Sequence, residues 1–464
     1  MQKVARQCYL PMNALLLKLI KENKGAFKCS FSITGSAVEQ FRAYAPEVLD
    51  SFRALAETGC VEFLAETYSH SLAALSSKED FTEQVKLHTK MIKEEFGKKP
   101  VAFRNTELIY SDQIGEMVSE LGFKTILAEG ARHVMGWKSP NYIYTNSIDN
   151  RLRVLLRNYK LSDDIAFRFS NQGWDQYPLT ADKFAQWVAD ENGEVINLFM
   201  DYETFGEHQK ATTGIFDFMK ALPKALLKHN DICFATVSEA AKSSQPVGVL
   251  HCPHVMSWAD EERDVTAWLG NELQNEAFSK LYALKDKVKS LKNADFEYVW
   301  NFMQTSDHFY YMATKWLSDG DVHSYFNPYG SSYEAFINYM NVLSDFYIRV
   351  DDALASGNVS RVNESPVAPV RIVKPKKKAT AEKAAANASL GSSSTSGVIS
   401  NLEKDVLNAL KNGDYDGLDS MISSIGGLAE TNPLGAHNAL KNIYDELSRQ
   451  RLMNEGDATT LEGL

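Results

Sequence analysis

The chain has 464 residues, of which 44% are hydrophobic, and its formal net charge is -11 with a pI near 5.5. This length can hold one large core and a smaller unit, since single domains usually span about 50–250 residues. The acidic balance gives no general attraction to nucleic-acid phosphates or anionic membranes, and no segment approaches the roughly 20 apolar residues of a membrane span. We therefore expect neither a nucleic acid nor a membrane as a partner.

The cysteines are few, odd in number and scattered along the chain, which is typical of reduced thiols in a core and not of a disulfide framework. Residues 1–20 form an amphipathic stretch interrupted by Pro11 and Lys18, without the apolar run and cleavage site of a signal peptide. Both features predict a cytoplasmic protein. The cysteines are Cys8, Cys29, Cys60, Cys233 and Cys252.

From about residue 10 to 240, short apolar runs alternate with segments of 3.6-residue periodicity, which is typical of a parallel α/β sheet or barrel. For example, Phe81, Val85, His88 and Ile92 share one helix face before Gly97 ends the helix. We predict a catalytic α/β domain over residues 1–255. Strands are expected at 61–64, 101–103, 123–127, 154–156, 196–200 and 232–235.

The second part of the chain changes character twice. Residues 256–354 are rich in aromatic side chains at helical spacing, so we expect a helical subdomain packed against the α/β domain. Residues 355–400 contain Pro, Lys, Ala and Ser runs that predict a disordered linker. Residues 401–464 hold amphipathic segments and predict a small helical hairpin with a ragged end.

Two carboxylates follow predicted strands, where substrate sites lie in parallel α/β folds. Glu107 follows the run 101–103 and has Arg104 three positions earlier, which would hold it ionised. Asp201 emerges from the apolar run 196–200, where desolvation would raise a carboxyl pKa as a general acid requires. Glycoside hydrolysis needs such a pair. Helix capping or a surface ion pair is the alternative for each carboxylate.

Aromatic residues lie beside polar ones in three predicted loops. Trp258 and Asp260 lie in one of them, and Asp307 and His308 in another. Sugar rings stack on aromatic rings while polar groups bind their hydroxyls. The segments therefore indicate sugar contacts, with core packing and helix caps as the alternative.

Metal and nucleotide chemistry have little support. His251, Cys252 and His254 contain ligand types, as do Asp307 and His308, but neither group has a zinc-site spacing. No Gly-x-Gly-x-x-Gly or P-loop spacing follows a predicted strand. We expect no metal and no cofactor.

At these residues the sequence resembles the α-amylase group of glycoside hydrolase family 57, over nearly all of positions 1–354. The nucleophile motif is similar to 102–110 (AFRNTELIY), and the acid/base motif to 199–208 (FMDYETFGEH). Further matches are 59–68 (GCVEFLAETY), 257–264 (SWADEERD) and 304–308 (QTSDH). The resemblance implies Glu107 as nucleophile, Asp201 as acid/base and a distorted (β/α)7-type parallel barrel completed by a helical domain. It places at the sugar subsites Glu62, Arg104, Trp258, Asp260, Asp307 and His308.

The family pattern normally opens with a strand carrying His-Gln-Pro, and no such tripeptide occurs in this sequence. We therefore expect a barrel lacking that first strand, with the ladder groups of its neighbours left open.

The predicted function is retaining hydrolysis of internal α-1,4 bonds in starch, glycogen or maltodextrins. One alternative is a 4-α-glucanotransferase, which passes the same intermediate to an acceptor sugar. The other is an inactive remnant that binds α-glucan without turnover. The oligomeric state is left open by the sequence.

Overall fold

The computed structural model describes residues 1–315, 327–356, 400–402 and 404–408. The chain divides into two compact units, Met1–Pro369 and Val370–Leu464. In the second unit the described residues are helical and Val406 is buried. Nearly all of the predicted linker and most of the predicted hairpin lie outside the described residues, so the fold that follows is that of the first unit.

The first unit begins with helix. A π-helical segment, η1 (Ala5–Tyr9), joins α1 (Gln2–Val4) to α2 (Leu10–Glu22). Pro11 lies in the first turn of α2, directly after the π-helical turn; it has no N–H to donate, and a π-turn is one way in which a helix accommodates such a gap. One face of this stretch is buried, and α2 packs against α4 (Pro46–Glu57) and α10 (Ile215–Leu226).

A curved parallel sheet follows the order β1, β2, β3, β4, β6. Parallel ladders join β1 to β2, β3 to β4 and β4 to β6. A bridge between Ala65 and Phe103 connects the end of β2 to β3, and one between Arg157 and Asn197 extends the order beyond β6. These strands are β1 (Cys29–Phe31), β2 (Val61–Phe63), β3 (Phe103–Arg104), β4 (Thr125–Glu129) and β6 (Arg153–Arg157).

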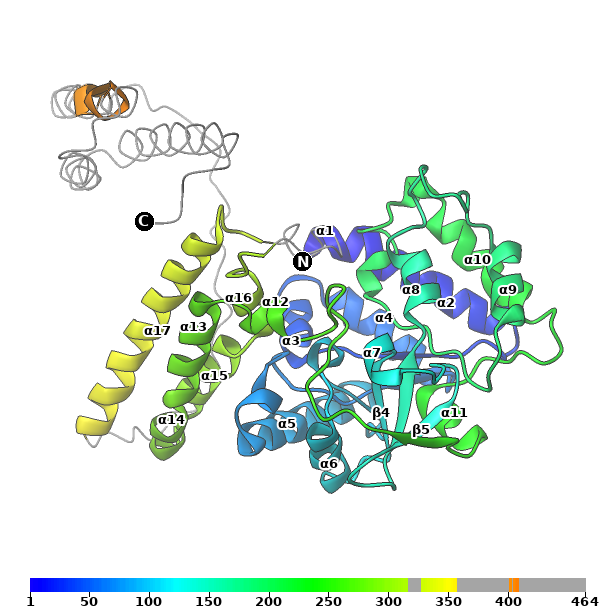
Figure 1. Ribbon diagram of the computed structural model, residues 1–464, viewed down its shortest axis with the longest axis horizontal. Helices are drawn as coiled ribbons and strands as arrows, with labels where there is room; N and C mark the ends of the chain where they lie inside the picture. The colour runs from blue at the N-terminus through cyan, green and yellow to red at the C-terminus, as the bar shows by residue number, and fades with distance from the viewer. Residues whose placement is uncertain (316–326, 357–399, 403, 409–464) are drawn as a thin grey trace. The chain divides into compact units, whose positions relative to one another are not determined.

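Helices surround this sheet (Figure 1). All residues of β4 are buried, as expected for a parallel strand covered on both faces. The prediction for α5 (Lys78–Phe96) is confirmed: Ser77 caps its start and Gly97, with φ 73°, ends it. The other helices of this part are α3 (Gly35–Tyr44), α6 (Asp112–Glu120), α7 (Arg132–Met135), α8 (Tyr159–Ala166), α9 (Ala181–Asp190) and α11 (Val237–Ser243).

The predicted strands at 196–200 and 232–235 do not form. An additional strand, β5 (Ile143–Asn146), pairs antiparallel with β6, and β7 (Gly248–Leu250) pairs with β5. Because β5 occupies that edge of β6, the segment 196–200 pairs only at Asn197 and stays half-buried. Residues 232–235 form no strand and lead into α11.

The burial of the cysteines follows from this arrangement. All five are free; Cys8, Cys60 and Cys252 are buried and Cys29 is half-buried. Cys233 is exposed, so its predicted place in the core is wrong, because residues 232–235 do not join the sheet.

The edge of β1 opposite β2 has no strand partner within the described part of the chain. No described helix is long and apolar enough to cross a membrane.

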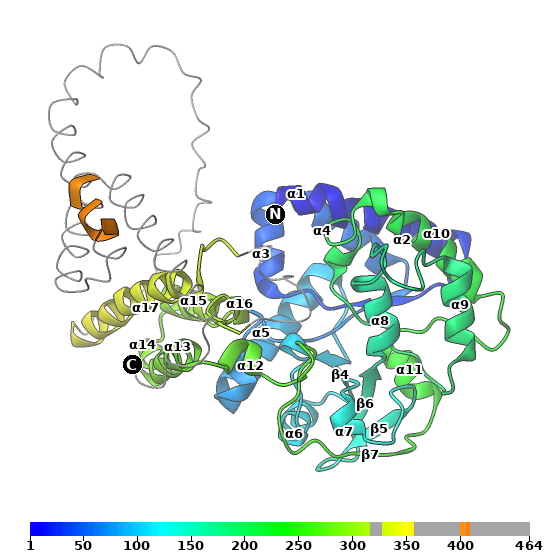
Figure 2. The ribbon, with the colours of Figure 1, turned by 45° about the horizontal axis from the view of Figure 1, so that its top comes forward.

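The helical region lies beside the barrel in both ribbon views (Figures 1 and 2). Trp268, Trp300 and Phe309 are fully buried in its core. It touches the loop after β2, since the Ser306 N–H donates to the His70 carbonyl at 2.9 Å. Its helices are α12 (Thr266–Leu269), α13 (Glu272–Ala283), α14 (Lys285–Leu291), α15 (Ala294–Met303), α16 (Ser306–Tyr310) and α17 (Ser332–Ala355).

Candidate active site

Glu107 lies in a strained turn directly after β3. Its backbone is left-handed, with φ 56° and ψ 26°, within the short 3-10 segment η3 (Thr106–Leu108). A non-glycine residue in this region costs on the order of 1–3 kcal/mol and persists only where its surroundings fix it. The Asn105 side-chain amide donates to the Ile109 carbonyl at 3.0 Å, and the Trp258 N–H donates to the Glu107 carbonyl at 3.2 Å. The turn is thus closed from both sides.

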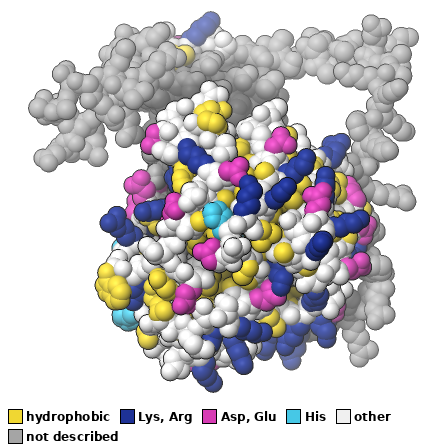
Figure 3. Space-filling view, turned by 90° about the vertical axis from the view of Figure 1, so that its right-hand side faces the viewer, with side chains coloured by type: hydrophobic (Ala, Val, Ile, Leu, Met, Phe, Trp, Pro, Cys, Tyr) yellow, Lys and Arg dark blue, Asp and Glu magenta, His cyan; other side chains and the backbone are white. Residues whose placement is uncertain are grey.

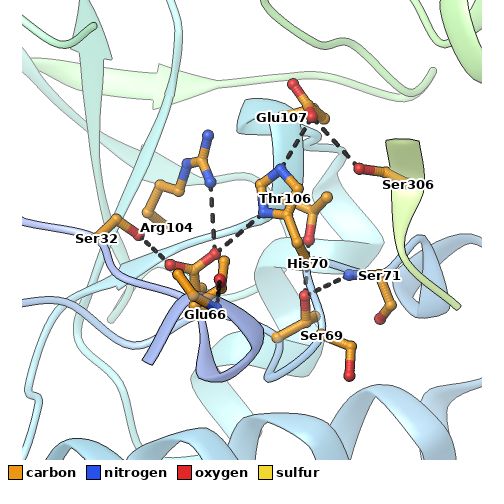
Figure 4. Close-up of polar contacts among 12 residues, drawn as sticks. Ser32, Glu66, Ser69, His70, Ser71, Arg104, Thr106, Glu107 and Ser306 are labelled. Atoms are coloured by element: carbon orange, nitrogen blue, oxygen red, sulfur yellow. Dashed lines mark hydrogen bonds and ion pairs between the residues drawn. The ribbon is translucent and has the colours of Figure 1, made fainter. Parts of the chain in front are cut away.

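The Glu107 carboxylate is buried and receives donors on both oxygens, and Figure 4 shows the two donors to Oε1. The His70 Nε2 lies 2.9 Å from Oε1, and the Ser306 hydroxyl lies 3.4 Å from the same oxygen. The Trp258 indole N–H donates to Oε2 at 2.8 Å. Donors directed at a carboxylate favour its charged form. The arrangement therefore holds an ionised carboxylate in one orientation.

His70 connects Glu107 to a second buried carboxylate, Glu66. The His70 Nδ1 lies 3.3 Å from Glu66 Oε2, and the Ser32 hydroxyl donates to Glu66 Oε1 at 2.7 Å. Burial alone would lower the pKa of His70, but its hydrogen bonds to Glu107 and Glu66 outweigh burial and raise the pKa to about 10. His70 is therefore an imidazolium at neutral pH and donates to both carboxylates.

Glu66 is held charged as well. Burial alone would raise its pKa, but the His70 hydrogen bond and the Arg104 guanidinium, 3.5 Å away, hold the pKa of Glu66 below its usual value. Glu66, His70 and Glu107 thus form a row of alternating charge across the barrel end (Figure 4).

The charge of His70 gives a pH dependence that can be measured. The folded pKa near 10 exceeds the unfolded value of about 6.5, so the stabilisation is complete below about pH 6.5 and is lost as the pH rises through 10. We expect the difference in melting temperature between the parent chain and His70→Gln to shrink between about pH 6.5 and 10. Thermal unfolding across this range measures it, with His133→Gln, an exposed histidine, as the control. A difference that stays constant over the range would contradict the assignment of charge.

Trp258 is held between two guanidinium groups. Arg104 lies 5.2 Å and Arg157 5.7 Å from its ring centroid, within cation–π range. The Phe199 ring lies 5.9 Å from Trp258, and Arg157 Nε donates to the Phe199 carbonyl at 2.6 Å. Arg263 also donates to the Trp258 carbonyl. The aromatic contact joins the Glu107 turn to the segment 196–200, and Asp201 follows that segment.

Asp201 is half-buried at the start of η4 (Tyr202–Thr204). Its neighbour Glu203 is half-buried and accepts a hydrogen bond from the Tyr9 hydroxyl. Burial raises the pKa of Glu203, and the charge of Asp201 raises it further. Asp201 and Glu203 are therefore two nearby carboxyl groups with different surroundings.

The N-terminal helix anchors the segment that carries Asp201. The Cys8 thiol lies 3.2 Å from the Tyr202 carbonyl, and the Tyr202 hydroxyl donates to Asn13 at 2.5 Å. Gly206, with φ 120°, lies so close to the Gln7 carbonyl that a Cβ would collide with it. The sequence after Asp201 therefore needs a glycine here.

We expect Gly206→Ala to lower the free energy of unfolding by about 2–4 kcal/mol, because the new methyl group both strains the backbone and meets the helix. Denaturant unfolding would measure the loss. Gly248→Ala is the matched control, since a Cβ there meets nothing within 4 Å. Equal stability of the two variants would contradict this account.

Several predicted substrate residues make other contacts. The Glu62 carboxylate accepts the Ser238 N–H at 2.9 Å at the start of α11, away from the Glu107 group. Asp260 pairs with Lys315 at 2.9 Å. The His308 ring lies 5.2 Å from the Tyr339 ring, and its Nε2 lies 3.2 Å from the Phe302 carbonyl.

Of the predicted site residues, Glu107, Arg104 and Trp258 are brought together, and Asp307 lies next to Ser306 in α16. The sequence did not single out His70, Glu66 or Ser306, although Glu66 and Ser306 lie in the family-like segments 59–68 and 304–308. The available signal was His70 in the loop four positions after Glu66.

Two of the residues considered for metal binding contact Asp112. The Cys252 N–H donates to Asp112 at 2.9 Å, and the His251 Nδ1 lies 2.8 Å from the same carboxylate. Within the part of the chain that the structure describes, no three His, Cys, Asp or Glu side chains form a metal-binding group.

Comparison with known proteins decides the family. The model of "Glycosyl hydrolase family 57" matches residues 1–253. The chain belongs to this family. A protein of Methanocaldococcus jannaschii named "Putative alpha-amylase" is 46% identical to it over 372 residues, which are 78% of this chain and 79% of that protein. The predicted family and the enzyme class, a glycoside hydrolase, are thereby confirmed.

Solved structures share the fold. A family 57 branching enzyme from Thermococcus kodakaraensis superimposes with a TM-score of 0.57 at 12% identity, over 77% of this chain and 86% of that one. A 4-alpha-glucanotransferase from Thermococcus litoralis gives 0.55 at 15% identity, and the match covers 66% of this chain and about half (52%) of that one. The predicted (β/α)7-type barrel with a helical region is confirmed.

Proposed function

We propose that this family 57 chain hydrolyses internal α-1,4-glucosidic bonds of starch, glycogen or maltodextrins with retention of configuration. The observation that carries the proposal is Glu107, a buried carboxylate held by His70 on one oxygen and Trp258 on the other. The name of the 46% identical relative supports the substrate class. Glu107 acts as the nucleophile and Asp201 as the acid/base.

Asp201 protonates the glycosidic oxygen while a Glu107 oxygen attacks the anomeric carbon, forming a covalent glycosyl-enzyme and releasing the first sugar. Asp201, now ionised, removes a proton from water, which attacks the same carbon and frees Glu107. His70 on Oε1 and Trp258 on Oε2 fix the orientation of the nucleophile.

Sugar contacts are proposed for Trp258, whose ring edge reaches Glu107, and for Asp307, which adjoins Ser306. Arg104 acts through Glu66 and Trp258 and orients the nucleophile. The predictions for Glu62, Asp260 and His308 require that these side chains exchange their present contacts when substrate binds.

Reducing-sugar release from soluble starch tests the proposal, with maltoheptaose products separated by length. We expect new reducing ends and shorter chains only. Lengthened products without a net gain of reducing ends would show that the chain catalyses 4-α-glucan transfer and not hydrolysis. Folded protein that binds maltoheptaose without turnover would identify a glucan-binding remnant.

A further inference from the structure

A cavity of about 1090 Å³ opens at the end of the barrel opposite the candidate active site. Its lining includes residues at the amino ends of β3, β4 and β6 and residues of α5 and α11. Glu107 follows the carboxyl end of β3, and parallel strands run in one direction, so the cavity and the carboxylates lie at opposite ends of the same strands. Small-molecule sites usually measure about 300–1,000 Å³, so the cavity has room for a ligand.

The charged residues of the lining are all cationic, although the whole chain has a net charge of -11. Lys86, Lys90 and Lys93 lie four and three positions apart on α5 and so share one helix face, where like charges destabilise a helix. On the face drawn in Figure 3, Lys and Arg side chains gather along the lower edge. The cations of the cavity are Lys86, Lys90, Lys93, Lys99, Lys124, Arg151, Arg153 and Lys242.

Most of these charges have no counter-ion within the described residues. Arg151 pairs with Asp149 at 2.6 Å, and Lys90 reaches Glu94 only at 3.9 Å. The Arg153 guanidinium donates to backbone carbonyls, among them that of Ser244 at 3.0 Å, which fix it on the wall without neutralising it. The lysines without an ion pair to any described residue are Lys86, Lys93, Lys99, Lys124 and Lys242.

The cavity also has an apolar side. Val85, Pro100, Val101 and Phe123 line it, and Val101 is 53% exposed. Covering such a surface removes apolar area from water, which is favourable. A ligand that fits both sides carries negative charge at one end and a ring or other apolar surface at the other.

We propose that this cavity binds a small organic phosphate, with its phosphate groups between the α5 lysines and Arg153 and its organic part over Val101 and Phe123. Lysine ammonium groups are compact point charges that suit phosphate oxygens. A nucleotide and a sugar phosphate share this chemistry. The proposal does not depend on the function proposed above, because no residue of the Glu107 group lines the cavity.

Isothermal titration of the full chain with ATP, and separately with glucose 1-phosphate, tests the proposal at about 0.15 M salt, where the Debye length is about 8 Å. We expect one saturable site for at least one of these probes. A response to ATP alone identifies a nucleotide, and one to glucose 1-phosphate alone a sugar phosphate. In the triple variant Lys86→Gln, Lys93→Gln, Lys124→Gln, we expect affinity to fall about tenfold or more, since several phosphate contacts are lost together.

The matched control removes the same charge elsewhere, with the exposed lysines of the variant Lys160→Gln, Lys220→Gln, Lys224→Gln. Its affinity should equal that of the parent chain, and melting curves should show both variants folded. Absence of saturable binding by either probe would overturn the proposal, as would equal loss of affinity in the two triple variants.

Discussion

Glu107→Gln should lower the rate of starch hydrolysis by about 10⁴-fold or more. Without the nucleophile the covalent glycosyl-enzyme cannot form, so the other groups of the site have no intermediate to act on. The amide has nearly the same shape as the carboxylate but no charge, and its NH₂ group faces either the His70 or the Trp258 donor. Reducing-sugar release measures the effect, with melting curves to establish folding. Glu57→Gln, an exposed glutamate at the end of α4, is the control.

Chemical rescue separates a lost nucleophile from a distorted site. Glu107→Ala leaves space where the carboxylate was, and added azide can attack the anomeric carbon from that space. We expect azide to restore turnover of an activated glucosyl substrate in Glu107→Ala and to leave Glu57→Ala unchanged. Activity of Glu107→Gln within about tenfold of the parent chain would contradict the assignment of the nucleophile.

Asp201→Asn should lower starch hydrolysis by about 10²–10⁴-fold, the usual contribution of a general acid or base. The loss should depend on the leaving group. Fluoride leaves without a proton, so the first step with an α-maltosyl fluoride should survive, while release of the intermediate is slow because water lacks its base. A burst of fluoride followed by slow turnover would show this. A loss of the fluoride burst as large as the loss with starch would argue that Asp201 has a structural role.

The parallel α/β pattern and several helices could be predicted because periodicity and caps are local. Ser77 and Gly97 mark α5 in the sequence as clearly as they do in the structure. The segment 196–200 could not be placed, because its pairing depends on β5, which occupies the edge of β6 and has no pattern that assigns it there. Local apolar runs indicate strand propensity but not which edge is free.

Part of the candidate site was also predictable. Glu107, Arg104 and Trp258 follow from strand ends and from the family motifs, and the structure groups them. His70 was missed because its role arises from two loops 37 residues apart in sequence and from its own left-handed backbone, with φ 54°. Neither feature leaves a periodic signal in the sequence.

The contact made by Glu62 was missed for a similar reason as the role of His70. Its carboxylate accepts the Ser238 N–H at 2.9 Å, so it interacts with the first turn of α11, 176 residues away in the chain. A family motif gives the residue type at that position but not the partner that the fold supplies. Buried polar groups find partners through tertiary structure, which the sequence order does not reveal.

The most direct test of the central claim is to trap the glycosyl-enzyme. Asp201→Asn would be mixed with an α-maltosyl fluoride, quenched in acid and digested, and the peptides analysed by mass spectrometry. We expect one added maltosyl group on the peptide that contains Glu107, and none in the double variant with Glu107→Gln. Fluoride release with no labelled peptide, or a label on another carboxylate, would contradict Glu107 as the nucleophile.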